Sequence, residues 1–303
     1  MKKTEKLYRE ILCVIKANHI KSCYPQLKAE KNRVNLWELD MSRQYNSDKM
    51  GSYNLGDYLA RVVVEFMLKG KGLSLESEVS HTKFLNSIGS NLGMSYQNAT
   101  IWGSGFEKEL PWMKNILQRR PLRKLDVRAV RGPLTYAYLK KLNQIPPPTI
   151  SNCNSIKYGD PAILMPFIYN PEVEKETNYI IIPQYVTESR CRKTYSDDLI
   201  VSMKTDDYKH VIDRIKSSKL VISSSLHGII LAECYGVPAV FFRGLHKNSD
   251  FKYKDYYYST NRFDFPIANT VEEALETKPL PIPDFSGLQQ GLLDSFPYDL
   301  WDK

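Results

Sequence analysis

The strongest constraint on the fold of this sequence is the alternation of short apolar segments and helical patterns in its second half. Apolar segments at 179–182, 220–222 and 238–242 predict strands, and the stretches 207–217 and 228–235 predict helices. Apolar strands that alternate with helices are typical of βαβ units, whose strands form a buried parallel sheet. The sequence therefore predicts an α/β fold.

The first half repeats this design less regularly. Its expected helices lie at 4–18, 58–68 and 133–142, and its expected strands lie at 34–39, 99–102 and 126–130. The length of 303 residues fits about two domains of ordinary size.

A polar segment bounded by prolines, 165–177, is interpreted as the linker between the two domains. We therefore expect two Rossmann-like domains that face each other across a cleft, one at 1–170 and the other at 171–303. The end of the chain, 284–303, is rich in aromatic residues and is expected to pack back on the body of the protein.

The formal net charge of +8 favours anionic partners, such as phosphorylated substrates, an anionic membrane surface or nucleic acid. The segment 251–258 interleaves basic and aromatic residues, a pattern that can stack on bases. No helix-turn-helix, zinc-finger or RNP motif accompanies it, so we expect no nucleic-acid partner. Peripheral contact with an anionic membrane stays open.

The five cysteines are scattered without a metal-binding spacing, and their odd number argues against a disulfide framework. The N-terminal segment has neither a signal-peptide pattern nor the roughly 20 apolar residues that would cross a bilayer. We expect a cytoplasmic protein, with docking at the inner face of the cytoplasmic membrane as an open alternative. Neither a metal site nor a cofactor is expected.

Four polar turns lie where predicted strands end or predicted helices begin. They are 54–57, 103–105, 131–132 and 223–228. Ligands of open parallel sheets bind at the carboxyl ends of the strands, and a helix N-terminus attracts anions. We therefore expect the substrate site among these turns.

The turn 223–228 is the most informative of the four because it holds three serines, a histidine and a glycine. His227 is suited to bind or protonate an anion, and Gly228 allows close approach of the backbone to a ligand or to the neighbouring strand. The alternative is that the serines cap the following helix and that His227 is an ordinary turn residue. Both interpretations stay open at this point.

Three charged side chains outside this turn are further candidates. Arg131 can hold a carboxylate or phosphate through two parallel hydrogen bonds, or it can form a surface salt bridge. Asp57 can cap its helix, act as a general base or bind a sugar hydroxyl. Asp160 precedes a proline and is interpreted as a helix cap rather than as an acid catalyst.

Six short motifs occur in one order along the chain. They are Asn54-Leu55-Gly56-Asp57, Gly103-Ser104-Gly105, Val130-Arg131-Gly132-Pro133-Leu134-Thr135, Gly159-Asp160-Pro161-Ala162, Ser225-Leu226-His227-Gly228 and Gly236-Val237-Pro238-Ala239. Each motif is weak alone, but their order is specific. Over about residues 50–260 the chain resembles the polysaccharide pyruvyl transferase family.

This resemblance implies transfer of a pyruvyl group from phosphoenolpyruvate to a sugar. The sugar would belong to a bacterial surface polysaccharide, as in exopolysaccharide or capsule biosynthesis, or to its lipid-linked precursor, and the product would be a pyruvate ketal. The second domain would hold the donor and the first domain would meet the acceptor. Proton delivery to the enol carbon requires a group with a pKa near neutrality, which is the natural range of histidine.

The resemblance also assigns roles to residues. Arg131, Leu226 and His227 would grip or protonate phosphoenolpyruvate. Asp57, as a possible general base, is counted with Arg131 and His227 among the expected catalytic residues. Some relatives carry an arginine where this chain has Ser225, so Arg243 or a lysine is expected to substitute. The expected substrate contacts are Asn54, Gly56, Gly103, Ser104, Gly105, Ser223, Ser224, Ser225, Leu226, Gly228 and Arg243.

Two other classes of protein fit the same pattern. Glycosyltransferases of the GT-B type have two facing Rossmann-like domains, and in such an enzyme the turn 223–228 would hold the diphosphate of a nucleotide sugar. The second alternative is a non-catalytic module that binds an anionic glycan or lipid through its basic face.

Overall fold

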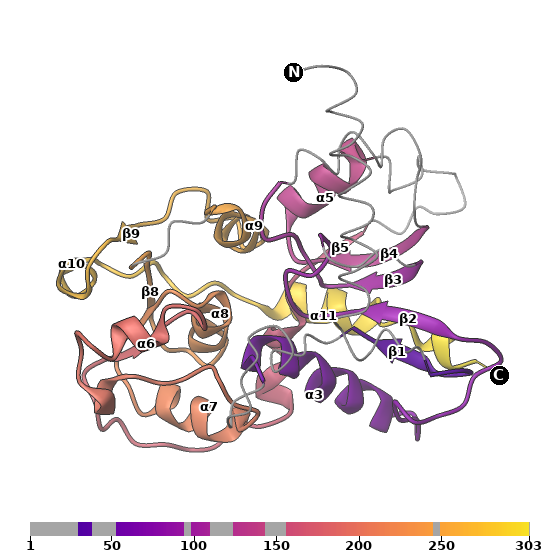
Figure 1. The fold of residues 1–303 in the computed structure, drawn as a ribbon, viewed down its shortest axis with the longest axis horizontal. Coiled ribbons are helices and arrows are strands. Elements are labelled where there is room, and N and C mark those ends of the chain that lie inside the picture. The colour runs from indigo at the N-terminus through magenta and orange to yellow at the C-terminus, as the bar shows by residue number, and fades with distance from the viewer. Residues whose placement is uncertain are drawn as a thin grey trace.

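The computed structural model describes residues 30–37, 53–93, 98–109, 124–142, 156–244 and 249–302. Within these ranges the chain forms two separate parallel sheets with helices packed around them (Figure 1). The expected mixture of helices and parallel strands is therefore confirmed. The expected helix at 4–18 lies outside the described residues.

The first sheet has five parallel strands in the sequential order β1-β2-β3-β4-β5. Its strands are β1 (Val34–Leu36), β2 (Lys83–Asn86), β3 (Ala99–Trp102), β4 (Leu125–Val130) and β5 (Lys157–Tyr158). Helix α3 (Leu55–Lys69) connects β1 with β2, and α5 (Pro133–Lys141) connects β4 with β5.

The two helices of the first half form for reasons visible in their sequences. Helix α3 buries Leu55, Leu59, Val63 and Met67, which recur every four residues and so share one face. It begins at Leu55, three residues before the expected start. Helix α5 begins at Pro133 as expected, because the fixed φ of proline suits the first helical position.

The second sheet has four parallel strands in the order β6-β7-β8-β9. Its strands are β6 (Ile180–Ile182), β7 (Val221–Ser223), β8 (Ala239–Phe242) and β9 (Ile267–Ala268). Between them lie α6 (Glu188–Cys191), η4 (Asp197–Leu199), α7 (Tyr208–Lys216), α8 (Leu226–Cys234) and α9 (Phe251–Ser259), and α10 (Val271–Glu276) follows β9.

The segment between the two sheets is not a simple linker. Its first part is the 3-10 helix η3 (Pro161–Phe167), which buries Pro161 through Met165 and packs against both α3 and α8. The expected linker at 165–177 therefore begins inside a buried element. One continuous apolar cluster runs from Leu36 and Leu59 through Leu164 to Ile182 and Ile230, so the two halves share a core.

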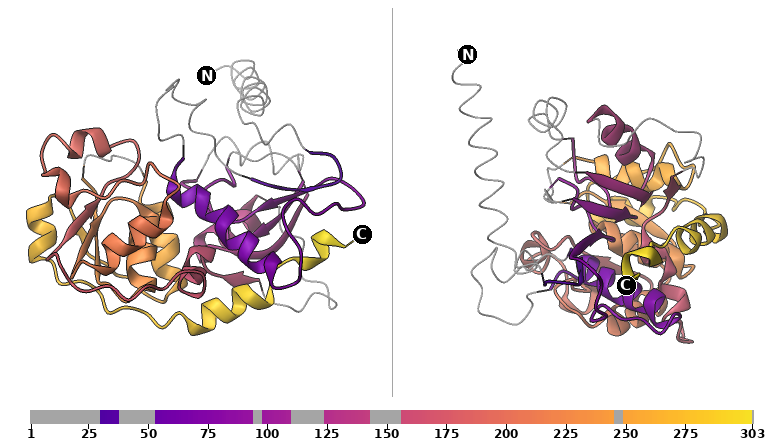
Figure 2. Two further views of the ribbon diagram at one scale, coloured as in Figure 1. Left: turned by 90° about the horizontal axis from the view of Figure 1, so that it is seen from below. Right: turned by 90° about the vertical axis from the view of Figure 1, so that its right-hand side faces the viewer.

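The end of the chain returns to the first sheet, as Figures 1 and 2 show for α11 (Ser286–Asp294) and η5 (Tyr298–Trp301). The indole N–H of Trp102 in β3 donates to the Leu292 carbonyl oxygen at 3.0 Å. The indole N–H of Trp301 donates to the Ser74 carbonyl oxygen at 3.1 Å. Helix α11 thus packs against strands β3 and β5, which lie more than 100 residues earlier in the sequence.

Helix α9 corrects the interpretation of segment 251–258 as a surface that can stack on bases. Tyr253, Tyr256 and Tyr257 are each at most 2 % exposed, and Tyr253 stacks on Phe241 of β8 with ring centroids 3.9 Å apart. These three tyrosines are therefore core residues, and Phe251 and Tyr258 are partly buried against the apolar clusters.

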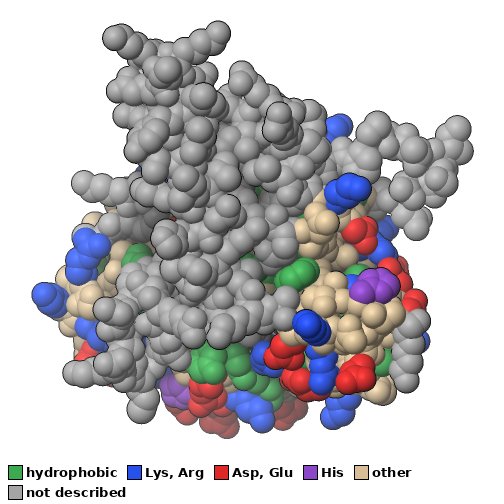
Figure 3. All heavy atoms as spheres, turned by 45° about the vertical axis from the view of Figure 1, so that its right-hand side comes forward, with side chains coloured by type: hydrophobic (Ala, Val, Ile, Leu, Met, Phe, Trp, Pro, Cys, Tyr) green, Lys and Arg blue, Asp and Glu red, His purple; other side chains and the backbone are tan. Residues whose placement is uncertain are grey.

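On the side seen in Figure 3, basic and acidic side chains are interspersed. The segment 114–131 carries seven basic residues and one acidic residue. Its first part, 114–123, lies outside the described residues, and its Arg128 pairs with Asp126 and Asp299. No described helix is both long enough and apolar enough to traverse a bilayer.

Candidate active site

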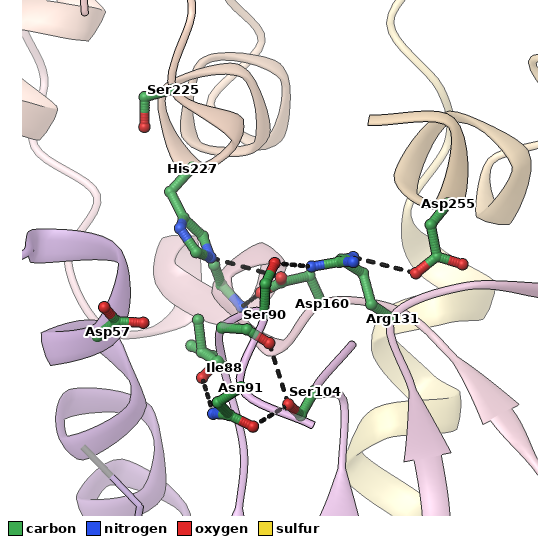
Figure 4. Close-up of polar contacts among 12 residues, drawn as sticks. Asp57, Ile88, Ser90, Asn91, Ser104, Arg131, Asp160, Ser225, His227 and Asp255 are labelled. Carbon is green, nitrogen blue, oxygen red and sulfur yellow. Dashed lines mark hydrogen bonds and ion pairs between the residues drawn. The ribbon is translucent and has the colours of Figure 1, made fainter. Parts of the chain in front are cut away.

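Three titratable side chains from different elements come together where the two halves meet (Figure 4). His227 extends from the first turn of α8, Asp160 caps η3, and Asp57 lies in the first turn of α3. Each element begins directly after a strand or a polar turn, which is where a parallel α/β sheet presents its ligand-binding groups. Two of the four expected turns, 54–57 and 223–228, thus meet at one place.

The imidazole of His227 faces the carboxylate of Asp160. His227 Nε2 lies 3.5 Å from Asp160 Oδ2, with the two side chains 12 % and 1 % exposed. Neither atom has a hydrogen-bond partner among the described residues. Unpaired buried polar atoms are costly and uncommon in native proteins, so this pair is a strong candidate for contact with a substrate.

Asp160 also confirms the expectation of a helix cap. Its Oδ1 accepts a hydrogen bond from the Ala162 backbone N–H at 3.1 Å, while Oδ2 is the atom that faces His227. The capping interaction fixes the carboxyl group and leaves its second oxygen toward the imidazole. The sequence predicted the cap but did not predict a place for Asp160 in the site.

Asp57 is a partly buried residue, and its carboxyl group lies beside this pair. Burial raises its pKa to about 6, although His227, the Asn54 side chain and Lys252 oppose the rise. Asn54 Nδ2 donates to Asp57 Oδ2 at 3.0 Å. Asp57 therefore does not cap α3 through its side chain, and it can exchange a proton near neutral pH.

Two glycines allow the close packing around His227. A Cβ on Gly56 would overlap the imidazole at Nδ1, so only glycine leaves room for this ring against the start of α3. A Cβ on Gly228 would overlap Ser223 Oγ and the Ile182 side chain. Of the two roles expected for Gly228, approach to the neighbouring strand is the one that the structure shows.

The three serines of the turn 223–228 have structural hydrogen bonds. Ser223 Oγ bonds to the Ile182 carbonyl oxygen at 3.0 Å, and Ser224 Oγ accepts the Gln184 backbone N–H at 2.9 Å. Ser225 is the N-cap of α8, and its hydroxyl oxygen accepts the Gly228 backbone N–H at 3.4 Å. The capping alternative is therefore correct for Ser225, and Leu226 beside it is buried in the core.

Arg131 is not presented as an open clamp for an anion. Its side chain is fully buried, and its Nε lies 3.1 Å from Asp255 Oδ2. Nη1 donates to Ser90 Oγ at 2.7 Å, and Nη2 donates to the Phe106 carbonyl oxygen. These partners occupy all three guanidinium nitrogens, so Arg131 is not available as a bidentate clamp for a ligand. Instead it forms buried hydrogen bonds and an ion pair that connect the two halves.

The turn 103–105 has an internal role as well. A Cβ on Gly103 would overlap Pro161, and a Cβ on Gly105 would overlap the Arg131 guanidinium. The Ser104 hydroxyl is buried and donates to the Gly89 carbonyl oxygen at 3.0 Å. Gly103 thus packs closely against Pro161, the residue after Asp160, and Gly105 packs closely against Arg131. Direct contact of residues 103–105 with substrate stays a prediction.

Arg243 is the expected substitute for the arginine missing at position 225. It lies just after β8 and pairs with Asp250, with Nη2 2.6 Å from Asp250 Oδ2 and the side chain 38 % exposed. It is thus engaged with the residue that precedes α9. A role in donor binding stays a prediction for Arg243.

Sequence reasoning missed two groups that the fold brings to this region. Asp255 binds Arg131 and also accepts hydrogen bonds from the Thr135 N–H at 2.9 Å and hydroxyl at 2.7 Å. Lys252, from the same helix, is buried near Asp57 and Arg131. Both lie in the segment 251–258, whose composition suggested an exposed aromatic surface and so hid them.

The fold and the site together define an α/β protein with a buried histidine between carboxylates at the ends of parallel strands. Residues 95–245 match the family model described as polysaccharide pyruvyl transferase, so this segment, which contains Asp160, Arg131 and His227, belongs to that family. The resemblance drawn from the six motifs is confirmed.

Two curated relatives share part of the chain. Uncharacterized protein L143 of Acanthamoeba polyphaga mimivirus is 29 % identical over 199 residues, which is 63 % of this chain and 64 % of that protein. General stress protein 30 of Bacillus subtilis strain 168 is 31 % identical over 147 residues, which is 43 % of this chain and 42 % of that protein. The chain thus spans less than two thirds of the length of these relatives.

One solved structure aligns with most of the chain. It is a functionally uncharacterized protein of Klebsiella pneumoniae, with 14 % identity and a TM-score of 0.46, covering 89 % of this chain and all of that one.

Proposed function

We propose that this chain is a pyruvyltransferase that moves a pyruvyl group from phosphoenolpyruvate to a sugar of a surface polysaccharide or of its lipid-linked precursor. The product would be a cyclic pyruvate ketal. The observation that carries this proposal is the unpaired His227–Asp160 contact, buried within the segment that belongs to the pyruvyl transferase family. We further propose that the two parallel sheets act as donor and acceptor domains in a GT-B-like arrangement.

The first step of the proposed reaction needs an acid. His227 donates a proton to C3 of the enol, which leaves an oxocarbenium-like centre at C2. The Asp160 carboxylate faces the imidazole and so can orient it toward the donor. The 3.5 Å separation is longer than a hydrogen bond, and contacts of this kind often tighten only when the substrate is bound.

The second step needs a base. One sugar hydroxyl attacks C2 and forms the first C–O bond. The C2–O bond to phosphate then breaks, and a second hydroxyl closes the ring. Of the two protons released by the hydroxyls, one replaces the proton that went to C3 and the other leaves with phosphate. Asp57, with a pKa near 6, is suited to accept a hydroxyl proton at neutral pH.

The decisive experiment incubates the full chain with phosphoenolpyruvate and a panel of acceptor glycans. Mass spectrometry would follow the pyruvyl increment on the glycan, and a colorimetric assay would follow phosphate release. Phosphoenolpyruvate labelled with ¹³C in its pyruvyl group identifies the source of the added mass. His227→Gln is the inactive comparison, and His210→Gln on the exposed face of α7 is the matched control.

We expect label on the glycan with the wild-type chain and with His210→Gln. Loss of a positioned acid is expected to slow transfer by about 10²- to 10⁴-fold in His227→Gln. A parallel incubation replaces phosphoenolpyruvate with nucleotide sugars. If no label reaches any glycan in the first incubation and a nucleotide sugar is consumed in the second, the protein is a glycosyltransferase and the proposal is wrong. Equal transfer by both histidine variants would remove His227 from the mechanism.

A further inference from the structure

A buried lysine close to the site has no adequate partner. The side chain of Lys252, at the second position of α9, is only 11 % exposed. Its Nζ lies 3.9 Å from Glu107 Oε1 and 5.3 Å from the centre of the Tyr253 ring. An ammonium group carries three N–H donors, and the carboxylate at 3.9 Å is beyond hydrogen-bonding distance. No closer contact of Nζ occurs within the described part of the chain.

The backbone around Lys252 is held firmly against the site. The hydroxyl of Tyr253, the next residue, donates to the Ser224 carbonyl oxygen at 2.7 Å, which ties α9 to the turn that precedes His227. On the other side, the α9 backbone at Asp255 lies so close to Gly132 that a Cβ on residue 132 would overlap the Asp255 carbonyl oxygen. Lys252 is therefore placed between the two halves by its neighbours and not by its own charge.

The charges nearby do not neutralise Lys252. Arg131 has its own buried carboxylate, Asp255, at 3.1 Å. Asp57 is near enough that the charge of Lys252 lowers its pKa, but burial of Asp57 has the larger and opposite effect. Burial likewise lowers the pKa of Lys252, with Arg131 adding to this and Glu107 opposing it. A buried cation without close hydrogen bonds is unfavourable unless something else supplies them.

We propose that Lys252 binds an oxyanion group of the donor substrate, so that the ligand supplies the hydrogen bonds that the protein does not. This inference rests on the proposed function in that phosphoenolpyruvate is the donor, and it adds a cation that the six motifs do not contain. Arg131, with its nitrogens already bonded, then acts behind the site. The ammonium of Lys252 contacts either the phosphate or the carboxylate of the donor.

The test compares Lys252→Met with Lys254→Met, which removes an exposed lysine from the same helix. Isothermal titration would measure the Kd of phosphoenolpyruvate, inorganic phosphate and pyruvate for each full-length variant. We expect the Kd of phosphoenolpyruvate to rise about 10- to 100-fold in Lys252→Met, as for loss of a hydrogen bond to a charged group, and to change less than twofold in Lys254→Met. If Lys252→Met also weakens binding of inorganic phosphate, the lysine contacts the phosphate of the donor; if it weakens binding of pyruvate, the lysine contacts the carboxylate.

Thermal unfolding without ligand distinguishes a ligand-binding lysine from a structural one. We expect the Tm of Lys252→Met to equal or exceed that of the wild type, because an apolar chain of similar size replaces an incompletely paired cation. Lys252→Arg keeps the charge and should retain part of the affinity. A lower Tm with unchanged affinity in Lys252→Met would overturn the inference, and Lys252→Gln would repeat the comparison if the methionine variant does not fold.

The outcomes for the inference and for the proposed function are separate. Donor binding that depends on Lys252, without transfer to any glycan, would support the inference and contradict the proposed function. Transfer with a KM for phosphoenolpyruvate that is unchanged in Lys252→Met would support the proposed function and contradict the inference about Lys252. A wild-type chain that binds none of the three probes would overturn both.

Discussion

His227 Nε2 lies 3.5 Å from Asp160 Oδ2, and both atoms are buried without a hydrogen-bond partner among the described residues. The two residues come from opposite halves of the molecule, since Asp160 follows the last strand of the first sheet and His227 begins the helix after β7. Any relative movement of the halves would therefore change this distance directly.

Asp160→Asn is predicted to separate the two functions of Asp160. Asparagine caps a helix as well as aspartate, so Oδ1 can still accept from Ala162 and the Tm should change little. The charge facing His227 is lost, and transfer should fall about 10- to 100-fold, as for loss of a charged hydrogen bond. Assays of phosphate release across pH would measure this. A large fall in Tm would show that Asp160 acts mainly as a structural residue.

Asp57 is predicted to make stability depend on pH. Its pKa in the folded protein is about 6, against 3.8 for the ordinary group. The folded state thus holds this proton more tightly, so the contribution of Asp57 to stability is fully present below about pH 4 and is lost as the pH rises through about 6. This difference corresponds to about 3 kcal/mol.

Asp57→Asn should remove this decline and make the protein more stable than the wild type at pH 7. Urea unfolding at pH 4 and pH 7 would measure the effect, with Asp264→Asn on an exposed loop as the control. Parallel stability curves for the wild type and Asp57→Asn would contradict the buried, proton-exchanging role. Transfer activity should fall in Asp57→Asn even where stability rises.

Gly56→Ala is predicted to lower activity although alanine is the better helix former. Within a helix this change normally stabilises by about 0.5–1 kcal/mol, but here the new Cβ would overlap the imidazole of His227. The ring must move away from Asp160, and kcat should fall more than the Kd for donor rises. Gly70→Ala, at the other end of α3, meets no close neighbour and is the control. Equal kcat values in the two variants would contradict the close packing of Gly56 against the His227 imidazole.

The pair Arg131–Asp255 is predicted to stabilise the contact between the halves. Arg131→Met or Asp255→Asn leaves the remaining partner without its counterpart, so each should lower the free energy of unfolding by about 3–5 kcal/mol. The double variant should lose less than the sum of the two. Arg128→Met, in β4 just before Arg131, removes partly exposed ion pairs and should cost less than about 1 kcal/mol.

Substrate kinetics complete the test of Arg131. If Arg131 bound the donor directly, the double variant would recover stability and still show a much higher KM for phosphoenolpyruvate. We expect stability and KM to recover together.

The periodic segments predicted the fold best. Strands β6, β7 and β8 and helices α7 and α8 were placed within two residues, because each is a short apolar or amphipathic run between turn residues. Helix α3 was started late, since its first turn, Leu55-Gly56-Asp57, contains residue types common in loops. Such local signals indicate the buried face of an element but not which distant elements pack against it.

The site was predicted only in part for the same reason. His227 and Asp57 stand in turns that could be found by their composition, and the structure brings them together. The role of Asp160 beyond its cap, and the pairing of Arg131 with Asp255 over 124 positions of sequence, depend on long-range packing. No spacing rule within one sequence reports such contacts.

The return of the chain end to the first sheet has a consequence for synthesis. Trp102 is bonded to a residue 190 positions later, and at the usual speed of a ribosome that interval lasts about 10 to 40 s. During this time the indole of the nascent chain has no cover, and the sheet around it exposes apolar surface. The first half is thus made first but completed last, which gives chaperones a defined period in which to bind it.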